Sequence, residues 1–367
     1  MKYLTKCFIA FFSLMLSTTM VFAISYPLFQ TSNRILEDSY YAFDTGDYGT
    51  AFRLAEEAKL MRRLEVDDCL NLFIQAMKPQ AVQKAGDSIS EVLIILRERE
   101  VFDAVELIEY LIDLKGVSFF DNSVEKIKNY IEEKRIFPEV SYIMAKIYEF
   151  EGEYDLAYSY YLDAWNNAQV LDIPDEKYDI LYDMATLSYN FTNLEDCEKT
   201  LLLILSEDSY FSDNSYSSAL ISNVERGYSI EKIFSLYRTD CYRTIPAFFR
   251  LTELYLEQGK SEEAFKTAIF GVLTAFTRID HILFSRVTEY QYDSLTDFFE
   301  LAMKYDDILN WSIDNGFWRC FYRLAELGID IYPENKEFGY SIMSIIAESA
   351  PEHYWRQLCI AKINQHN

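Results

Sequence analysis

Two helix-forming patterns meet at Gly152, within the segment VSYIMAKIYEFEGEYDLAYSYYLDAWNNA that spans residues 140–168. Small residues recur along both patterns, at Ala145, Ala157 and Ala164. Residues spaced by about four and seven positions lie on one helix face, so these alanines let two helix axes approach closely. One such hairpin cannot bury all its apolar surface, and we therefore expect it to pack on further hairpins.

Three other segments repeat this arrangement, at residues 32–60, 178–205 and 245–271. Their turns are predicted at Gly46, at Thr192-Asn193 and at Gly259, and their small inner residues at Ala51, Cys197 and Ala264. A weaker hairpin spans 86–114, with Ala104 at the small site and Arg99 in place of the turn glycine. Residues 65–82, 316–331 and 334–365 are predicted as further helices.

These segments resemble tetratricopeptide repeats, most closely at residues 138–164 and 245–271. The resemblance implies an all-α, right-handed solenoid of stacked antiparallel hairpins. The small residues Ala51, Ala104, Ala157, Cys197 and Ala264 are 53, 53, 40 and 67 residues apart. A strict repeat has a period of about 34 residues, so the stack should be irregular.

The N-terminal segment is typical of a secretory signal peptide. Lys2 and Lys6 precede an apolar run, and Val21-Phe22-Ala23 ends in a small residue, which predicts cleavage after Ala23. Residues 1–23 would then be removed and the protein exported, without lipid attachment, to the periplasm or the extracellular space, with envelope association left open. An uncleaved membrane anchor is the alternative, and in that case this segment alone would contact the membrane.

The remaining chain divides by composition into two repeat regions. Residues 24–205 form an N-terminal set of repeat-like helices, and residues 228–367 a C-terminal set with capping helices. The intervening residues 206–227 are rich in Ser, Asp, Asn and Tyr, which predicts a surface loop or a break in the stack.

The formal net charge of −25 restricts the partners of this chain. Such an acidic surface repels nucleic-acid phosphates, so no nucleic-acid partner is expected. A protein or peptide with a basic segment would be attracted instead. Five widely spaced cysteines follow the signal segment, which is no disulfide framework, although one disulfide stays open.

The resemblance also implies a concave groove lined by the first helix of each hairpin. Its predicted partner-binding residues are Tyr142, Lys146, Glu149, Tyr182, Tyr189, Phe249 and Glu253. Further groove positions transfer to Glu139, Asp179, Thr186, Pro246 and Leu256, and with a poorer match to Asn33, Leu36, Tyr40 and Phe43. The lining would be aromatic and acidic, and tyrosine suits binding sites because it combines a stiff ring with a polar tip.

The sequence contains no motif for catalysis, a metal or another cofactor. No CxxC pair, phosphate loop, nucleophile elbow or dinucleotide-binding motif occurs, and the three histidines are widely separated. The favoured hypothesis is an exported scaffold that binds a protein or peptide without catalysis. The alternatives are a secreted carbohydrate-active enzyme built as a helical toroid with paired carboxylates, and a solute-binding accessory of a transporter.

Overall fold

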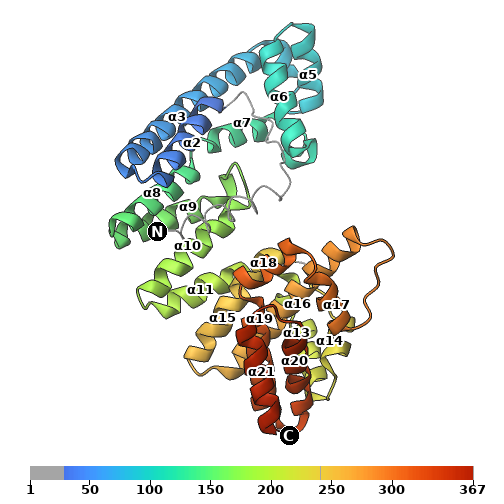
Figure 1. Cartoon of the computed structure of the whole chain (residues 1–367). Helices are drawn as coiled ribbons and strands as arrows, with labels where there is room; N and C mark the ends of the chain where they lie inside the picture. The colour runs from blue at the N-terminus through green and yellow to red at the C-terminus, as the bar shows by residue number, and fades with distance from the viewer. Residues whose placement is uncertain (1–28, 240, 367) are drawn as a thin grey trace. The chain divides into compact units, whose positions relative to one another are not determined.

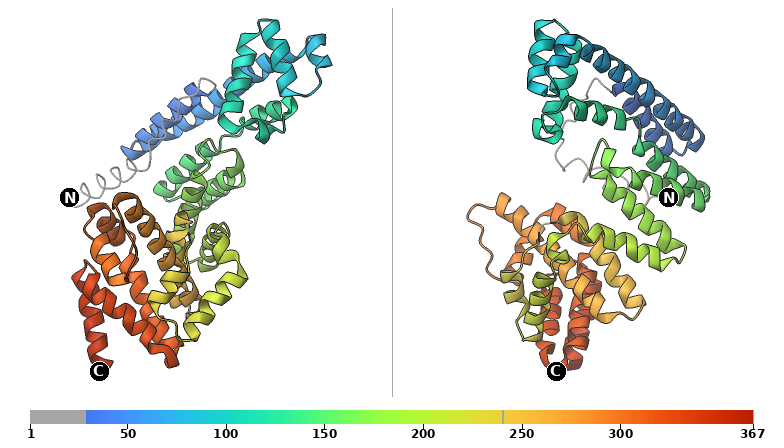
Figure 2. Two further views of the ribbon diagram at one scale, coloured as in Figure 1. Left: turned by 90° about the vertical axis from the view of Figure 1, so that its right-hand side faces the viewer. Right: turned by 180° about the vertical axis from the view of Figure 1, so that it is seen from behind.

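The computed structural model describes residues 29–239 and 241–366, and this part of the chain is all-helical, without a β-strand. It divides into two compact units, the first ending at Lys177 and the second beginning at Tyr178 (Figures 1 and 2). The signal-peptide prediction falls on residues that lie outside the described part. The all-α prediction is confirmed.

Unit 1 is built from helical hairpins arranged along one long helix, α3 (Figure 1). Its α-helices are α2 (Gln30–Asp44), α3 (Tyr48–Met77), α4 (Gln80–Lys84), α5 (Ile89–Glu98), α6 (Phe102–Lys115), α7 (Val124–Glu133), α8 (Pro138–Glu151) and α9 (Tyr154–Asn166). Two short 3-10 helices, η1 (Val117–Phe120) and η2 (Ala168–Val170), follow α6 and α9.

Two separate apolar cores lie along α3. The N-terminal half of α3 packs on α2 and α8 through Ala51, Ala55 and Ala58. The C-terminal half joins α4 to α7 through a second set of residues, from Val66 to Ala76. The stretch of α3 between Ala58 and Val66 thus lies at the junction of the two cores.

Unit 2 repeats the hairpin theme with a larger number of helices. Its main α-helices are α10 (Glu176–Asn190), α11 (Leu194–Leu205), α15 (Ile245–Glu257), α16 (Ser261–Arg286), α19 (Phe317–Ile331), α20 (Lys336–Ser349) and α21 (His353–His366). Shorter α-helices fill the connections: α12 (Ser209–Ser212), α13 (Asn214–Glu225), α14 (Ile230–Leu236), α17 (Leu295–Ala302) and α18 (Asp306–Asp314). The 3-10 helices η3 (Tyr242–Thr244) and η4 (Pro333–Asn335) precede α15 and α20.

The predicted turns and small sites are confirmed. Gly46, Gly152 and Gly259 adopt positive φ angles of 83°, 84° and 70° at the ends of α2, α8 and α15, a conformation that glycine takes without strain. The five small anchors are all buried, at Ala51, Ala104, Ala157, Cys197 and Ala264. The buried Ser39 hydroxyl donates to the Ala51 carbonyl over 2.7 Å, so even this polar small site serves a close helix contact.

The structure corrects three element boundaries. Residues 206–227 are mostly helical, because the Asp208 and Asp213 carboxylates cap the first amides of α12 and α13. Residues 65–82 are no separate helix, since α3 continues to Met77 and neither Gly nor Pro interrupts it between residues 50 and 78. Residues 334–365 form two helices, α20 and α21, rather than one.

Within the described residues, one helix is long and apolar enough to cross a membrane. This helix is α16, and most of its apolar window is buried inside unit 2. Ala268 through Thr277 are all buried, and Gly271 lies against Phe248 and Phe249 so closely that an added Cβ would come within 3.0 Å of both. These contacts identify α16 as the core helix of the unit.

Candidate functional site

A pocket of about 400 Å³ lies between the first helices of three hairpins in unit 2. It is lined from α10 by Ala185, Thr186 and Tyr189, from α11 by Cys197 and Leu201, from α15 by Phe249, Arg250, Glu253, Leu254 and Glu257, and from the start of α19 by Arg319 and Cys320, with Asn315 and Gly316 preceding that helix. We call it the α10–α15–α19 groove. Its floor is apolar and its rim is charged.

Four charged side chains form the rim, two acidic and two basic. The Arg319 guanidinium donates to both carboxylate oxygens of Glu253, over 3.0 and 2.6 Å. Arg250 donates to the Thr186 hydroxyl over 2.9 Å, and the Tyr189 hydroxyl donates to Glu257 over 3.0 Å. The rim is therefore balanced in charge, whereas the sequence predicted an acidic lining.

The hydrogen bonds across the groove follow the repeat spacing. Tyr189 and Glu257 are 68 residues apart, as are Tyr182 and Arg250, and Glu253 and Arg319 are 66 apart. Two periods of a 34-residue repeat would give about the same spacing. The hairpin α10–α11 contacts α15 directly, so the extra segment α12–α14 is bypassed.

That extra segment packs against the core of unit 2. Phe211 makes edge-to-face contacts with Phe248 and Phe270, at centroid distances of 5.2 Å each. Phe234 lies 4.7 Å from the Phe276 ring. The segment fills the space beside α15 and α16, and its aromatic residues explain why it folds as helices rather than as an exposed loop.

Four predicted groove positions line the pocket: Thr186, Tyr189, Phe249 and Glu253. Tyr182 does not line it. The Tyr182 hydroxyl donates to the Arg243 carbonyl over 2.6 Å and accepts from the Ala247 amide over 3.2 Å. This tyrosine therefore fixes the start of α15 against α10, which is a positioning contact.

The predicted residues of unit 1 are engaged in intramolecular contacts. Tyr142 is only 7% exposed and packs on the Tyr161 ring, and the Lys146 ammonium lies 5.1 Å from the Tyr142 ring centroid. Glu149 accepts the Tyr161 hydroxyl over 2.7 Å. The predicted Tyr142 anchor is thus wrong as an exposed contact, because the packing of α8 and α9 turns this ring inward.

The sequence prediction missed Arg250, Arg319 and Glu257. Each lies about two repeat periods from its partner, so pairing residues at that spacing would have found them. Cys320 and Cys197 are buried at the groove floor. Burial raises the pKa of the Cys197 thiol to about 11, so this floor thiol stays protonated and apolar.

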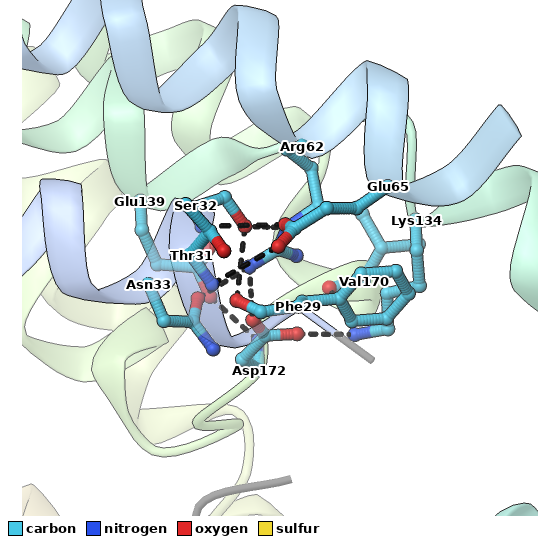
Figure 3. Close-up of polar contacts among 10 residues, drawn as sticks. All are labelled: Phe29, Thr31, Ser32, Asn33, Arg62, Glu65, Lys134, Glu139, Val170 and Asp172. Atoms are coloured by element: carbon cyan, nitrogen blue, oxygen red, sulfur yellow. Dashed lines mark hydrogen bonds and ion pairs between the residues drawn. The ribbon is translucent and has the colours of Figure 1, made fainter. Parts of the chain in front are cut away.

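A second polar cluster lies in unit 1, at the junction of the two apolar cores (Figure 3). Arg62 of α3 is 1% exposed; it donates to Asp172 over 2.8 Å and to the Ser32 hydroxyl over 2.9 Å. Lys134 donates to the same carboxylate and to the Val170 carbonyl, both over 2.8 Å. Phe137 covers the guanidinium at 3.7 Å, so the charge is enclosed.

Glu139 and Asp172 are two carboxylates of this cluster that influence each other electrostatically. Burial, together with the Asp172 charge, raises the pKa of Glu139 to about 7. Burial works against ionisation of Asp172 too, but the charges of Arg62 and Lys134 outweigh it and lower its pKa. Two neighbouring carboxyl groups whose pKa values are shifted in opposite directions are typical of acid–base catalysis.

The two carboxylates differ in access, since the Asp172 side chain is 27% exposed and Glu139 is buried. Glu139 is 4% exposed, and its Oε1 accepts the Asp172 backbone amide over 2.6 Å. Its Oε2 is buried without a hydrogen-bond partner among the described residues. A substrate cannot reach a carboxylate closed in this way, so the cluster joins α2, α3, α8 and the segment after η2. Neither this cluster nor any other set of described residues groups three or more His, Cys, Asp or Glu side chains as a metal site would require.

The comparisons with known proteins add one relative. No family model matches this chain. The chain is similar to an uncharacterized protein of Treponema pallidum (strain Nichols), with 28% identity over 297 residues, covering 80% of this chain and 79% of the relative.

Proposed function

We propose that this protein is an exported, tetratricopeptide-like scaffold that binds a protein or peptide in the α10–α15–α19 groove, without catalysis. The hairpins would stack as an irregular right-handed solenoid, with α10, α15 and α19 as successive first helices. The observation that carries the proposal is the groove itself, which collects Tyr189, Phe249 and Glu253 from matched repeat positions.

The lining specifies the chemistry of the partner. Phe249, Leu201 and Leu254 offer space for one apolar side chain of an extended segment. Among the rim acids, Glu253 is held by two arginines, Arg319 and Arg323, whereas Glu257 is exposed and accepts only the Tyr189 hydroxyl among the described residues. A lysine or arginine beside the apolar residue would therefore pair with Glu257.

The same rim argues against the glycosidase alternative. Glu253 and Glu257 are one turn apart on α15, so both carboxylates project from one side of the groove. A glycosidase needs two carboxylates that flank the scissile bond. In the other carboxylate pair, Glu139 is only 4% exposed and is therefore closed to solvent.

A peptide selection tests the proposal. Peptides displayed on phage would be selected against the full chain, and their affinities measured for the wild type and for the double variant Tyr189→Ala/Glu257→Ala. Both residues are exposed, so the fold should survive, and truncating the anchor should lower affinity by about 2 kcal/mol, or roughly thirtyfold.

Tyr354→Ala supplies the matched control, because Tyr354 is an exposed aromatic residue of unit 2 that does not line the groove. Its affinity should equal that of the wild type. Equal binding of all selected peptides by wild type and the groove variant would place the binding surface elsewhere.

A further inference from the structure

A second, smaller pocket of unit 2 lies at the C-terminal end of α16. Its volume is about 270 Å³, and Tyr242, Arg278, His281, Ile282 and Ser285 line it. Four of these residues lie on α16 at spacings of three, four and seven positions, so they share one helix face. Tyr242 of η3 forms the opposite wall.

Arg278 is the central cation of this pocket. Its guanidinium carbon lies 4.8 Å from the Tyr242 ring centroid and 5.5 Å from that of Trp311 in α18. No hydrogen bond or ion pair to this guanidinium is found among the described residues. Rings that cover the faces of a guanidinium leave its edges, where the N–H donors are, for another partner.

The neighbouring acids do not neutralise Arg278. Asp280 accepts the Tyr290 hydroxyl over 2.6 Å, and Asp307 accepts both terminal nitrogens of Arg286, over 2.8 and 2.7 Å. Burial, reinforced by the like charge of Arg243, lowers the pKa of Arg278, while no carboxylate acts to raise it. A half-buried arginine that has no counter-charge among residues 29–239 and 241–366 is unexpected in a chain of net charge −25.

We propose that this pocket binds the oxyanion of a small molecule, a carboxylate or a phosphate monoester carried on an apolar body. The edge of the Arg278 guanidinium would donate to two of its oxygens, as arginine does with carboxylate and phosphate. His281 can add an N–H donor one turn further along α16, whereas the Ser285 hydroxyl already donates to the Ile282 carbonyl over 2.7 Å. Tyr242 and Ile282 would contact the apolar body, and the volume limits it to about the size of one ring.

The site differs from the α10–α15–α19 groove, with which it shares no lining residue. It takes a small anion, whereas the groove is proposed for a peptide. The two proposals can therefore fail independently.

Titration of the full chain with phenyl phosphate and, separately, with benzoate tests the site. Trp311 fluorescence reports directly, because its ring contacts Arg278. We expect saturable binding of at least one probe, and the tighter of the two identifies the anion class. Arg278→Gln should bind at least about tenfold more weakly, the usual effect of losing a charge-assisted pair.

Two further variants keep the test decisive. Arg226→Gln removes an equal charge from an exposed position of unit 2 and should bind as the wild type does. Arg278→Lys keeps the charge but loses the planar fork, and should bind several-fold more weakly; it decides the case if Arg278→Gln fails to fold. Absence of saturable binding at tens of millimolar probe, or unchanged affinity in the folded Arg278 variants, would overturn the proposal.

Discussion

Arg62 in unit 1 and Arg319 in unit 2 both pair with a carboxylate, yet their surroundings differ. Arg62 is 1% exposed, and its partner Asp172 is also held by Lys134. Arg319 is 53% exposed at a groove rim, where it pairs with Glu253. Solvent makes an exposed pair weak and exchangeable, whereas enclosure makes a buried pair hard to break. The first is suited to fixing helices together and the second to contacting a partner.

The largest expected effect is on the buried pair. Arg62→Met leaves Asp172 with Lys134 as its one cation among the described residues and removes the donors to Ser32 and Asn33. Because it removes the buried partner of Asp172, whose side chain is 27% exposed, this substitution should lower the free energy of unfolding by about 3 kcal/mol. Urea unfolding followed by far-UV circular dichroism measures the loss.

The tryptophans separate the two units in this experiment. Trp311, Trp318 and Trp355 lie in unit 2 and Trp165 alone in unit 1, so tryptophan fluorescence follows mainly unit 2. The dichroism transition should move to lower urea and the fluorescence transition much less. Arg53→Met, which removes an exposed pair with Glu57, should change stability by less than about 1 kcal/mol. If Arg62→Met and Arg53→Met lowered the free energy of unfolding equally, the distinction between enclosed and exposed ion pairs would be contradicted.

A somewhat smaller effect is expected at a small site of unit 1. Ala157 is fully buried where α8 and α9 approach each other, so Ala157→Trp should cost about 1–3 kcal/mol or more through overpacking. Leu156→Trp provides the control, because Leu156 is 45% exposed and precedes Ala157 directly. Thermal midpoints of both variants test the register, and a control that is as unstable as Ala157→Trp would show that the register is wrong.

The buried cluster also predicts a pH dependence. The pKa of Glu139 is raised from 4.5 to about 7 in the folded chain, so between these values the folded state binds more protons than the unfolded state. Its contribution to stability is therefore present at low pH and lost as pH rises from about 4.5 to 7. Asp172, with its lowered pKa, acts oppositely, and only below its ordinary value of 3.8.

Glu139→Gln isolates this contribution. Glutamine keeps an acceptor for the Asp172 amide and cannot ionise, so unit 1 should be more stable than the wild type at pH 8, by roughly 1–3 kcal/mol, and the difference should vanish near pH 5. Dichroism-monitored urea unfolding at both pH values measures it. A variant that is less stable than the wild type at pH 8 would mean that the ionised carboxylate has a partner that stabilises it.

The sequence predicted much of the fold and part of the groove. Local signals located the hairpins. Gly46, Gly152 and Gly259 adopt positive φ angles at the turns, and the buried positions after each turn have room only for a small residue such as alanine. Tyr189 and Phe249, two of the predicted site residues, line the pocket of unit 2. Arg319 was missed because its pairing depends on a contact 66 residues away.

Two errors have the same physical origin. The Ser- and Asp-rich composition of residues 206–227 predicted a surface loop or a break in the stack. The loop alternative is wrong, because Asp208 and Asp213 cap helices and Phe211 packs on Phe248. Tyr142 was predicted to face a partner, but it packs on Tyr161. In both cases tertiary packing determined the conformation, which local composition alone does not specify. The Arg62 cluster could not be predicted from local sequence, because its residues come from four segments that are far apart in the chain.

The smallest effect on stability is expected for Arg319→Gln, which tests the contrast between the Arg62 and Arg319 ion pairs directly. Arg319→Gln removes the bidentate donor to Glu253, but the Arg319 side chain is 53% exposed, and Arg323 still contacts the carboxylate. Unit 2 should lose no more than about 1 kcal/mol of unfolding free energy, measured by fluorescence-monitored urea unfolding.

The same substitution makes the rim of the groove more acidic. It should therefore raise the association rate of a basic groove peptide, and this increase should become smaller as salt is added. Stopped-flow measurements at two salt concentrations test this, with Arg356→Gln of α21 as the control. A loss of stability comparable to that of Arg62→Met would show that the pair in unit 2 is structural, and the contrast between the two units would then disappear.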